Sequence, residues 1–156
     1  DTWAARGHLF IVADGMGAHA AGELASKMAT DNIPHSYHKM GDLAPPAALR
    51  QAIRDANLVI HTKGQSNIGF QGMGTTCSCL VLLPQGALVA HIGDSRVYRL
   101  RGNLLEQLTF DHSLVWEMAA AGRMMPTLMS TNERASIRQL SYSGWLDRKR
   151  IWKTNQ

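Results

Sequence analysis

The spacing of apolar residues divides the first part of the chain into a short strand and two long helices. Residues 8–13 form a continuous apolar run, which predicts a buried strand. Over residues 18–40 the apolar positions recur at three- and four-residue steps, which predicts an amphipathic helix that residues 31–34 (Asp-Asn-Ile-Pro) interrupt or end. The proline pair at residues 45–46 opens a second predicted helix. Its apolar stripe consists of Leu49, Ala52, Ile53, Ala56, Leu58, Val59 and Ile60.

From residue 75 onward the apolar spacing becomes that of strands separated by tight turns. Four strands are predicted, at residues 77–83, 87–92, 96–101 and 104–108. Such a series is typical of an antiparallel meander. A further helix is predicted to begin at residues 111–113 and to end at Gly122. The order of strand, two helices, meander and helix predicts an α+β fold in which helices pack on antiparallel sheet.

Composition agrees with an ordinary globular domain and gives no sign of a membrane segment. The 156 residues are 45% hydrophobic and 18% charged, and no apolar run approaches the roughly 20 residues that cross a bilayer. We also find no secretory signal. Cys77 and Cys79 lie two residues apart on one predicted strand, a spacing that is poor for a mutual disulfide, and no Cys or His pair nearby completes a metal site. We therefore expect buried, reduced thiols and a cytoplasmic protein.

The positive charge of the chain is concentrated at its end. Residues 133–156 hold six basic and two acidic side chains, which equals the whole net charge of +4, whereas residues 1–132 are neutral. The basic triplet at residues 148–150 lies between Trp145 and Trp152, a combination that could contact nucleic acid or another acidic surface. A short, solvated chain end is the commoner structure of such a segment, so nucleic acid is not the partner we expect.

One acid occupies a chemically informative position. Asp14 and Gly15 directly follow the first predicted strand, so a carboxylate and a backbone carbonyl lie close to the same point. Carboxylate and carbonyl oxygens are the ligands that hard divalent cations prefer. The same dipeptide also makes ordinary turns without any chemistry. These residues alone leave both interpretations open.

Five separated segments together resemble one family, the metal-dependent (type 2C, PPM) protein serine/threonine phosphatases, in their bacterial branch. They occur in the family's order at residues 9–17, 19–23, 73–76, 92–98 and 108–113. The resemblance implies a layered α-β-β-α sandwich, two antiparallel sheets flanked by helices with metals at one end. We expect residues 1–126 to form an incomplete, N-terminal portion of that domain. Residues 127–156 have no clear period and are expected to be a divergent, poorly ordered basic tail.

The resemblance also implies roles for four residues. Asp14 corresponds to the catalytic aspartate that bridges two Mn²⁺ or Mg²⁺ ions, and Gly15 to the residue whose carbonyl binds one of them. Asp1 corresponds to a further acid of the same cluster. Asp94 corresponds to an acid at a third, weaker metal position, although it could equally cap a turn. Thr75 and Thr76 are expected to start a core strand, and Asp111 and His112 to serve as a helix cap and a structural contact.

The implied reaction is the hydrolysis of phosphoserine and phosphothreonine in proteins. Paired ions activate a water and neutralise the phosphoryl oxygens, so no covalent enzyme intermediate is needed. Two further aspartates of the family, and an arginine before Asp1, have no counterpart in this sequence, and the first residue is not Met. We therefore expect a truncated member with little activity. The alternatives are a catalytically silent remnant that binds a phosphoprotein or acidic partner, and a fragment without function; the oligomeric state stays open.

Overall fold

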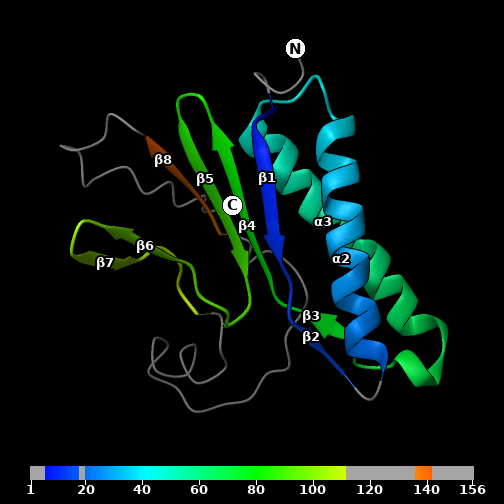
Figure 1. Cartoon of the computed structure of the whole chain (residues 1–156). Helices are drawn as coiled ribbons and strands as arrows, with labels where there is room; N and C mark the ends of the chain where they lie inside the picture. Colours follow the sequence, from blue (N-terminus) through cyan, green and yellow to red (C-terminus); the bar gives the residue numbers. More distant parts are fainter. Residues whose placement is uncertain (1–5, 18–19, 112–135, 142–156) are drawn as a thin grey trace, which may run out of the picture.

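The computed structural model of the chain places two long helices against one face of an antiparallel sheet (Figure 1). The structure describes residues 6–17 and 20–111, together with the backbone of residues 136–141. The helices and sheet form two layers, with the hydrophobic core between them. This arrangement confirms the predicted α+β class and the packing of helices on antiparallel sheet.

The main sheet has four strands in the order β1-β4-β5-β8, and every neighbouring pair is antiparallel. The strands are β1 (His8–Val12), β4 (Cys77–Leu83), β5 (Gly86–Ile92) and β8 (Ser136–Ser141). Thus β1 lies beside β4, although nearly all of the helical region separates them in the sequence (Figure 1). The pattern of apolar residues predicted β1, β4 and β5 within one or two residues.

Helices α2 (Ala20–Lys39) and α3 (Pro45–Ser66) pack side by side over the sheet (Figure 1). As predicted, prolines occupy the start of α3, where their missing N–H groups leave no hydrogen bond unmade. A short 3₁₀ turn, η1 (Ile68–Phe70), follows within the glycine-rich segment. The core consists of alternate residues of β4 and β5 and one face of each helix: Ala25, Ala29, Ile33, Tyr37, Ala48, Leu49, Ala52, Ile53, Ala56, Ile60, Cys77, Cys79, Val81, Leu83, Leu88 and Ala90.

The predicted break at residues 31–34 is wrong, because α2 continues through Pro34 to Lys39. Proline removes one helical hydrogen bond, but the residues on either side of it are held by the core. Ile33 and Tyr37 are fully buried, and the Tyr37 hydroxyl donates a hydrogen bond of 2.8 Å to the backbone carbonyl of Arg6. Tertiary packing therefore overrides the local preference of proline.

The stripe predicted for α3 is correct for five residues and wrong for two. Leu49, Ala52, Ile53, Ala56 and Ile60 are buried. Leu58 and Val59 are instead exposed, at 65% and 43% of their surface. Both side chains continue the apolar run in the sequence. In a helix with 3.6 residues per turn, however, they lie on the side that faces away from the core.

The predicted meander is split between two sheets. Strands β6 (Tyr98–Arg101) and β7 (Leu104–Gln107) pair only with each other among the described residues, as a hairpin that leaves the main sheet. The chain turns away after β5 at Gly93, whose φ of +107° is a conformation that favours glycine. A third sheet joins β2 (Gly15–Met16) to β3 (Gly74–Thr75) beside the first turns of α2 (Figure 1).

Strand β8 lies in the segment for which the sequence predicts neither helix nor strand. Its residues pair with β5 in antiparallel register, from Gly86 with Ser141 to His91 with Ser136. The segment Ser-Ile-Arg-Gln-Leu-Ser lacks the alternation of a half-buried strand, so the sequence pattern did not reveal this strand.

Two further predictions concern the end of the chain. The boundary at residue 126 stays a prediction, and the helix expected after residue 111 lies outside the described residues. In the described part of the chain, no helix has the length and apolar character that crossing a bilayer requires.

Candidate metal centre

Asp14 lies directly after β1, where neighbouring threonines hold its backbone on both sides. Its N–H donates to Thr76 Oγ1 at 3.1 Å. Its carbonyl accepts from the Thr76 N–H at 2.9 Å and from Thr75 Oγ1 at 3.1 Å. The side chain is exposed, and within residues 6–17 and 20–111 no hydrogen bond or ion pair engages its carboxylate. A fixed backbone therefore presents a carboxylate that is free to bind a cation.

Gly15, the residue after Asp14, makes a close backbone contact with Gly22 of α2. A Cβ atom on Gly15 would lie only 1.9 Å from the backbone carbonyl oxygen of Gly22, in the first turn of the helix. No side chain other than hydrogen fits there, since such a distance is far inside van der Waals contact. The glycine after Asp14 is thus required by packing, and this need is independent of any metal ligation by its carbonyl.

Asp94 lies in the turn that follows β5, and this turn contacts the same threonine as Asp14. Ser95 Oγ donates to Thr76 Oγ1 at 2.9 Å. A Cβ atom on Gly93 would come within 2.8 Å of Thr76 Cγ2, so the turn packs directly on the threonine methyl group. The Asp94 side chain is exposed, and in the described part of the chain its carboxylate makes no hydrogen bond.

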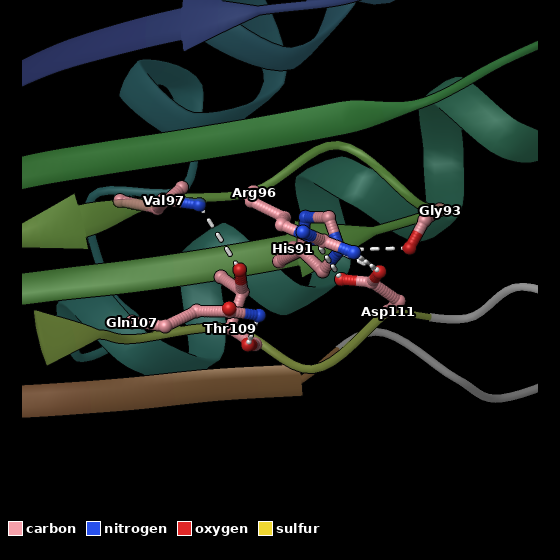
Figure 2. A network of polar contacts seen from close by, with 7 residues as sticks. All are labelled: His91, Gly93, Arg96, Val97, Gln107, Thr109 and Asp111. Carbon is pink, nitrogen blue, oxygen red and sulfur yellow. Dashed lines mark hydrogen bonds and ion pairs between the residues drawn. The ribbon is translucent and has the colours of Figure 1, made fainter. Parts of the chain in front are cut away.

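A buried histidine ties the same turn to the sheet (Figure 2). His91 is fully buried; its Nε2 lies 2.8 Å from the Gly93 carbonyl and its Nδ1 lies 3.1 Å from Ser78 Oγ. Because a carbonyl only accepts, Nε2 carries the proton, and Nδ1 accepts from the serine hydroxyl. Burial lowers the pKa of His91, against the opposing effects of the Gly93 carbonyl and of Asp111 and Asp94. The neutral imidazole thus holds the start of the turn.

An ion pair and a threonine hold the other end of the turn. Figure 2 shows Arg96 facing Asp111, and the guanidinium binds both carboxylate oxygens at 2.5 to 2.9 Å. These hydrogen bonds raise the pKa of Arg96. The Val97 N–H donates to Thr109 Oγ1 at 3.0 Å, and Gln107 Nε2 donates to the Thr109 carbonyl at 2.7 Å. Asp111 therefore makes a structural contact; the helix it was expected to cap lies outside the described residues.

The predicted site residues are therefore placed as follows. Asp14 and Gly15 lie at the end of β1, and the turn that carries Asp94 is joined to them through Thr76. Asp1 lies outside the described residues. Carboxylate and carbonyl oxygens fit Mn²⁺ or Mg²⁺ in kind. Across the described ranges, however, no group of three or more His, Cys, Asp or Glu residues could hold an ion.

Sequence reasoning missed the part that Thr75 and Thr76 play in this site. The pattern indicated only that they precede a strand, and a hydroxyl group at a strand start carries no signal for its distant partner. The hydrogen bonds of both threonines to Asp14 span more than 60 residues of sequence, because they join positions 61 and 62 apart. Such contacts follow from the pairing of β1 with β4 rather than from any local motif.

The fold and this site define a class of protein, a helix-covered antiparallel sheet with exposed acids at the strand ends. The family model described as "Protein phosphatase 2C" matches residues 1–138 of the chain. The chain belongs to the protein phosphatase 2C family. This result confirms the resemblance drawn from the five sequence segments, and the match includes the first residues of β8.

Relatives and solved structures agree with the family. The serine/threonine phosphatase stp of Listeria welshimeri is 38% identical over 133 residues, which are 83% of this chain and 53% of that protein. The structure of the serine/threonine phosphatase Stp1 from Staphylococcus aureus superposes with a TM-score of 0.70 at 32% identity, covering 86% of this chain and 60% of that one. The chain therefore spans about half the length of the curated relatives it matches.

One similar structure contains metal. It is the catalytic domain of the serine/threonine protein phosphatase PstP in complex with two manganese ions, with a TM-score of 0.65 at 32% identity, covering 85% of this chain and 62% of that one. The likeness supports a metal-dependent family.

Proposed function

We propose that this chain contributes the N-terminal part of the metal cleft of a protein serine/threonine phosphatase, which hydrolyses phosphoserine and phosphothreonine in proteins. One observation carries the proposal. The Asp14 carboxylate is exposed and makes no hydrogen bond within the described residues, while Thr75 and Thr76 hold its backbone on both sides. A carboxylate with no structural partner on a rigid backbone is a ligand arranged in advance.

The residues would divide the work of the cleft as follows. The Asp14 carboxylate and the Gly15 carbonyl would hold Mn²⁺ or Mg²⁺, with Asp1 as a further ligand and Asp94 at a third, weaker position. When bound, paired ions supply an activated water and neutralise charge on the phosphoryl oxygens. The chain's own contribution is to keep Asp14 and the 93–95 turn at a fixed separation, through the contacts of Thr76.

We further propose that the 156-residue chain by itself has little turnover. A binuclear centre needs several carboxylates, and no cluster of three ligating side chains occurs in the described part of the chain. The alternative function is a silent module that binds a phosphoprotein or another acidic partner. The concentration of the +4 net charge in residues 133–156 favours this alternative.

The proposed partner is a phosphorylated protein, and the proposed location is the cytoplasm. Cys77 and Cys79 support this location, since both are buried and carry free thiols. Reduced, buried thiols are usual in a reducing compartment.

The test is hydrolysis of p-nitrophenyl phosphate and of a phosphothreonine peptide by the folded chain, with and without Mn²⁺. We expect turnover near the background rate, together with Mn²⁺ binding that Asp14→Asn weakens. Strong metal-dependent turnover that Asp14→Asn abolishes would establish the phosphatase and contradict the low activity. A folded chain that binds no Mn²⁺ but binds the phosphopeptide would replace the enzyme with the binding module.

A further inference from the structure

We infer that Thr76 is a positioning residue that sets the separation between Asp14 and the turn carrying Asp94. The inference rests on the proposed function, because it concerns the same candidate ligands. The hydroxyl of Thr76 contacts both segments, and its methyl group also packs against the turn. It lies directly before the first residue of β4, a central strand of the main sheet.

The hydroxyl oxygen of Thr76 joins the two segments by accepting two hydrogen bonds. One comes from the backbone N–H of Asp14 at 3.1 Å and the other from Ser95 Oγ at 2.9 Å. A threonine hydroxyl has two acceptor lone pairs, so both are used. Removing the oxygen would leave the Asp14 N–H and the Ser95 hydroxyl without this shared acceptor.

The methyl group of Thr76 sets how closely the turn approaches. A Cβ atom on Gly93 would lie 2.8 Å from Thr76 Cγ2 and 2.9 Å from its Cβ, so only glycine allows this contact. The φ of +107° at Gly93 likewise suits glycine. Valine at position 76 would keep the methyl contact and lose the acceptor, whereas serine would keep the acceptor and lose the methyl group.

Rigid surroundings allow Thr76 to act in this way. Its own N–H donates to the Asp14 carbonyl at 2.9 Å, and the next residue, Cys77, is buried in the core. The turn is held independently by His91, which binds the Gly93 carbonyl. Metal ligands must be held to within about 0.5 Å, so a side chain that bridges two ligand-bearing segments controls affinity without touching the ion.

The first measurement is amide hydrogen exchange at Asp14 in the metal-free chain. Thr76→Val should raise the exchange rate of the Asp14 amide by about tenfold, the factor that corresponds to one typical hydrogen bond. Thr76→Ser should restore the exchange rate to near that of the unsubstituted chain. The matched control is Thr30→Val, which removes a hydroxyl that donates to the Ser26 carbonyl within α2 and should leave Asp14 unchanged. Equal exchange at Asp14 in Thr76→Val and the unsubstituted chain would overturn the inference.

The second measurement is the affinity for Mn²⁺, from the electron paramagnetic resonance signal of the free ion. Thr76→Val should weaken binding by about tenfold, with rescue by Thr76→Ser and no change in Thr30→Val. Equal affinity in Thr76→Val overturns the inference. If the unsubstituted chain binds no Mn²⁺, the proposed function fails, whereas the exchange rates still decide the role of Thr76.

A second variant covers the case in which Thr76→Val does not fold. Ser95→Ala removes one of the two donors to Thr76 Oγ1 at a half-buried position outside the core. Loss of this link should raise exchange at Asp14 by about threefold, less than the loss of the acceptor itself. An unchanged exchange rate at Asp14 in Ser95→Ala would then overturn the inference.

Discussion

The two faces of β1 carry similar apolar residues but have opposite environments. Toward α2 and α3, the strands present a core that is closed by small residues of the helices, such as Ala29 and Ala52. On the other face of β1, Phe10 is 55% exposed and Val12 is 70% exposed. A strand that is apolar on both faces is typical of a sheet covered on both faces. The comparison shows that sequence pattern reports which residues suit burial, whereas the packed layers decide which are buried.

The largest effect is expected on the helix-covered face. Leu49→Ala removes a fully buried side chain of α3 and should lower the free energy of unfolding by about 2–5 kcal/mol. Leu58→Ala on the same helix is the control, because Leu58 is exposed, and its change should stay within about 0.5 kcal/mol. Urea unfolding measures both. Similar losses in the two variants would mean that the two sides of α3 do not differ as described.

The next effect is expected where the sheet ends against α2. Gly15→Ala would place a Cβ atom 1.9 Å from the Gly22 carbonyl oxygen, so the backbone must move, at a cost of about 1–3 kcal/mol. The displaced Asp14 should also bind Mn²⁺ more weakly. Gly41→Ala is the matched control, since no atom lies within 4 Å of its added methyl group. Thermal unfolding and Mn²⁺ titration of both variants test this contact; a tolerated Gly15→Ala contradicts it.

A smaller effect follows from His91 on the other face of β5. Burial lowers its folded pKa below the ordinary value of 6.5. As the pH falls from 6.5 toward the lower folded pKa, the unfolded chain takes up a proton that the folded chain does not, so stability decreases. Above pH 6.5 the contribution is fully present. Urea unfolding at about pH 7.5 and 5.5 should show a smaller acid loss in His91→Gln than in the unsubstituted chain; equal losses contradict the assignment.

The smallest effect is expected on the exposed face of β1. Phe10→Ser should change the free energy of unfolding by about 1 kcal/mol or less, because more than half of the side chain is already in water. Removing an exposed aromatic residue should also reduce self-association of the chain. Unfolding and light scattering measure the two quantities. A loss as large as that of Leu49→Ala would show that this face is covered in solution.

Local pattern predicted most elements of the fold, and tertiary contacts account for what it missed. The spacing of apolar residues located β1, α2, α3, β4 and β5, because the spacing typical of a strand or a helix persists along the whole of each element. The continuation of α2 through Pro34 depends on packing against the core, and the departure of β6 from the main sheet depends on the turn at Gly93. The spacing of apolar residues encodes neither feature.

The candidate site divides in the same way. Asp14 could be found from its place after an apolar strand. The hydroxyl of Thr76 could not, because its partners are 62 and 19 residues away. Sequence therefore reveals the side chain that is offered to a ligand more readily than the side chains that hold it in place.

We propose that Asp14 is a metal ligand held at the end of β1. The most direct test is the binding of Mn²⁺ to the folded chain, compared with Asp14→Asn and with Asp42→Asn, an exposed acid far from it in sequence. We expect Asp14→Asn to weaken binding by at least about tenfold, as the loss of a charged ligand requires, whereas Asp42→Asn should bind like the unsubstituted chain. Equal Mn²⁺ affinity in all three proteins would contradict the proposal.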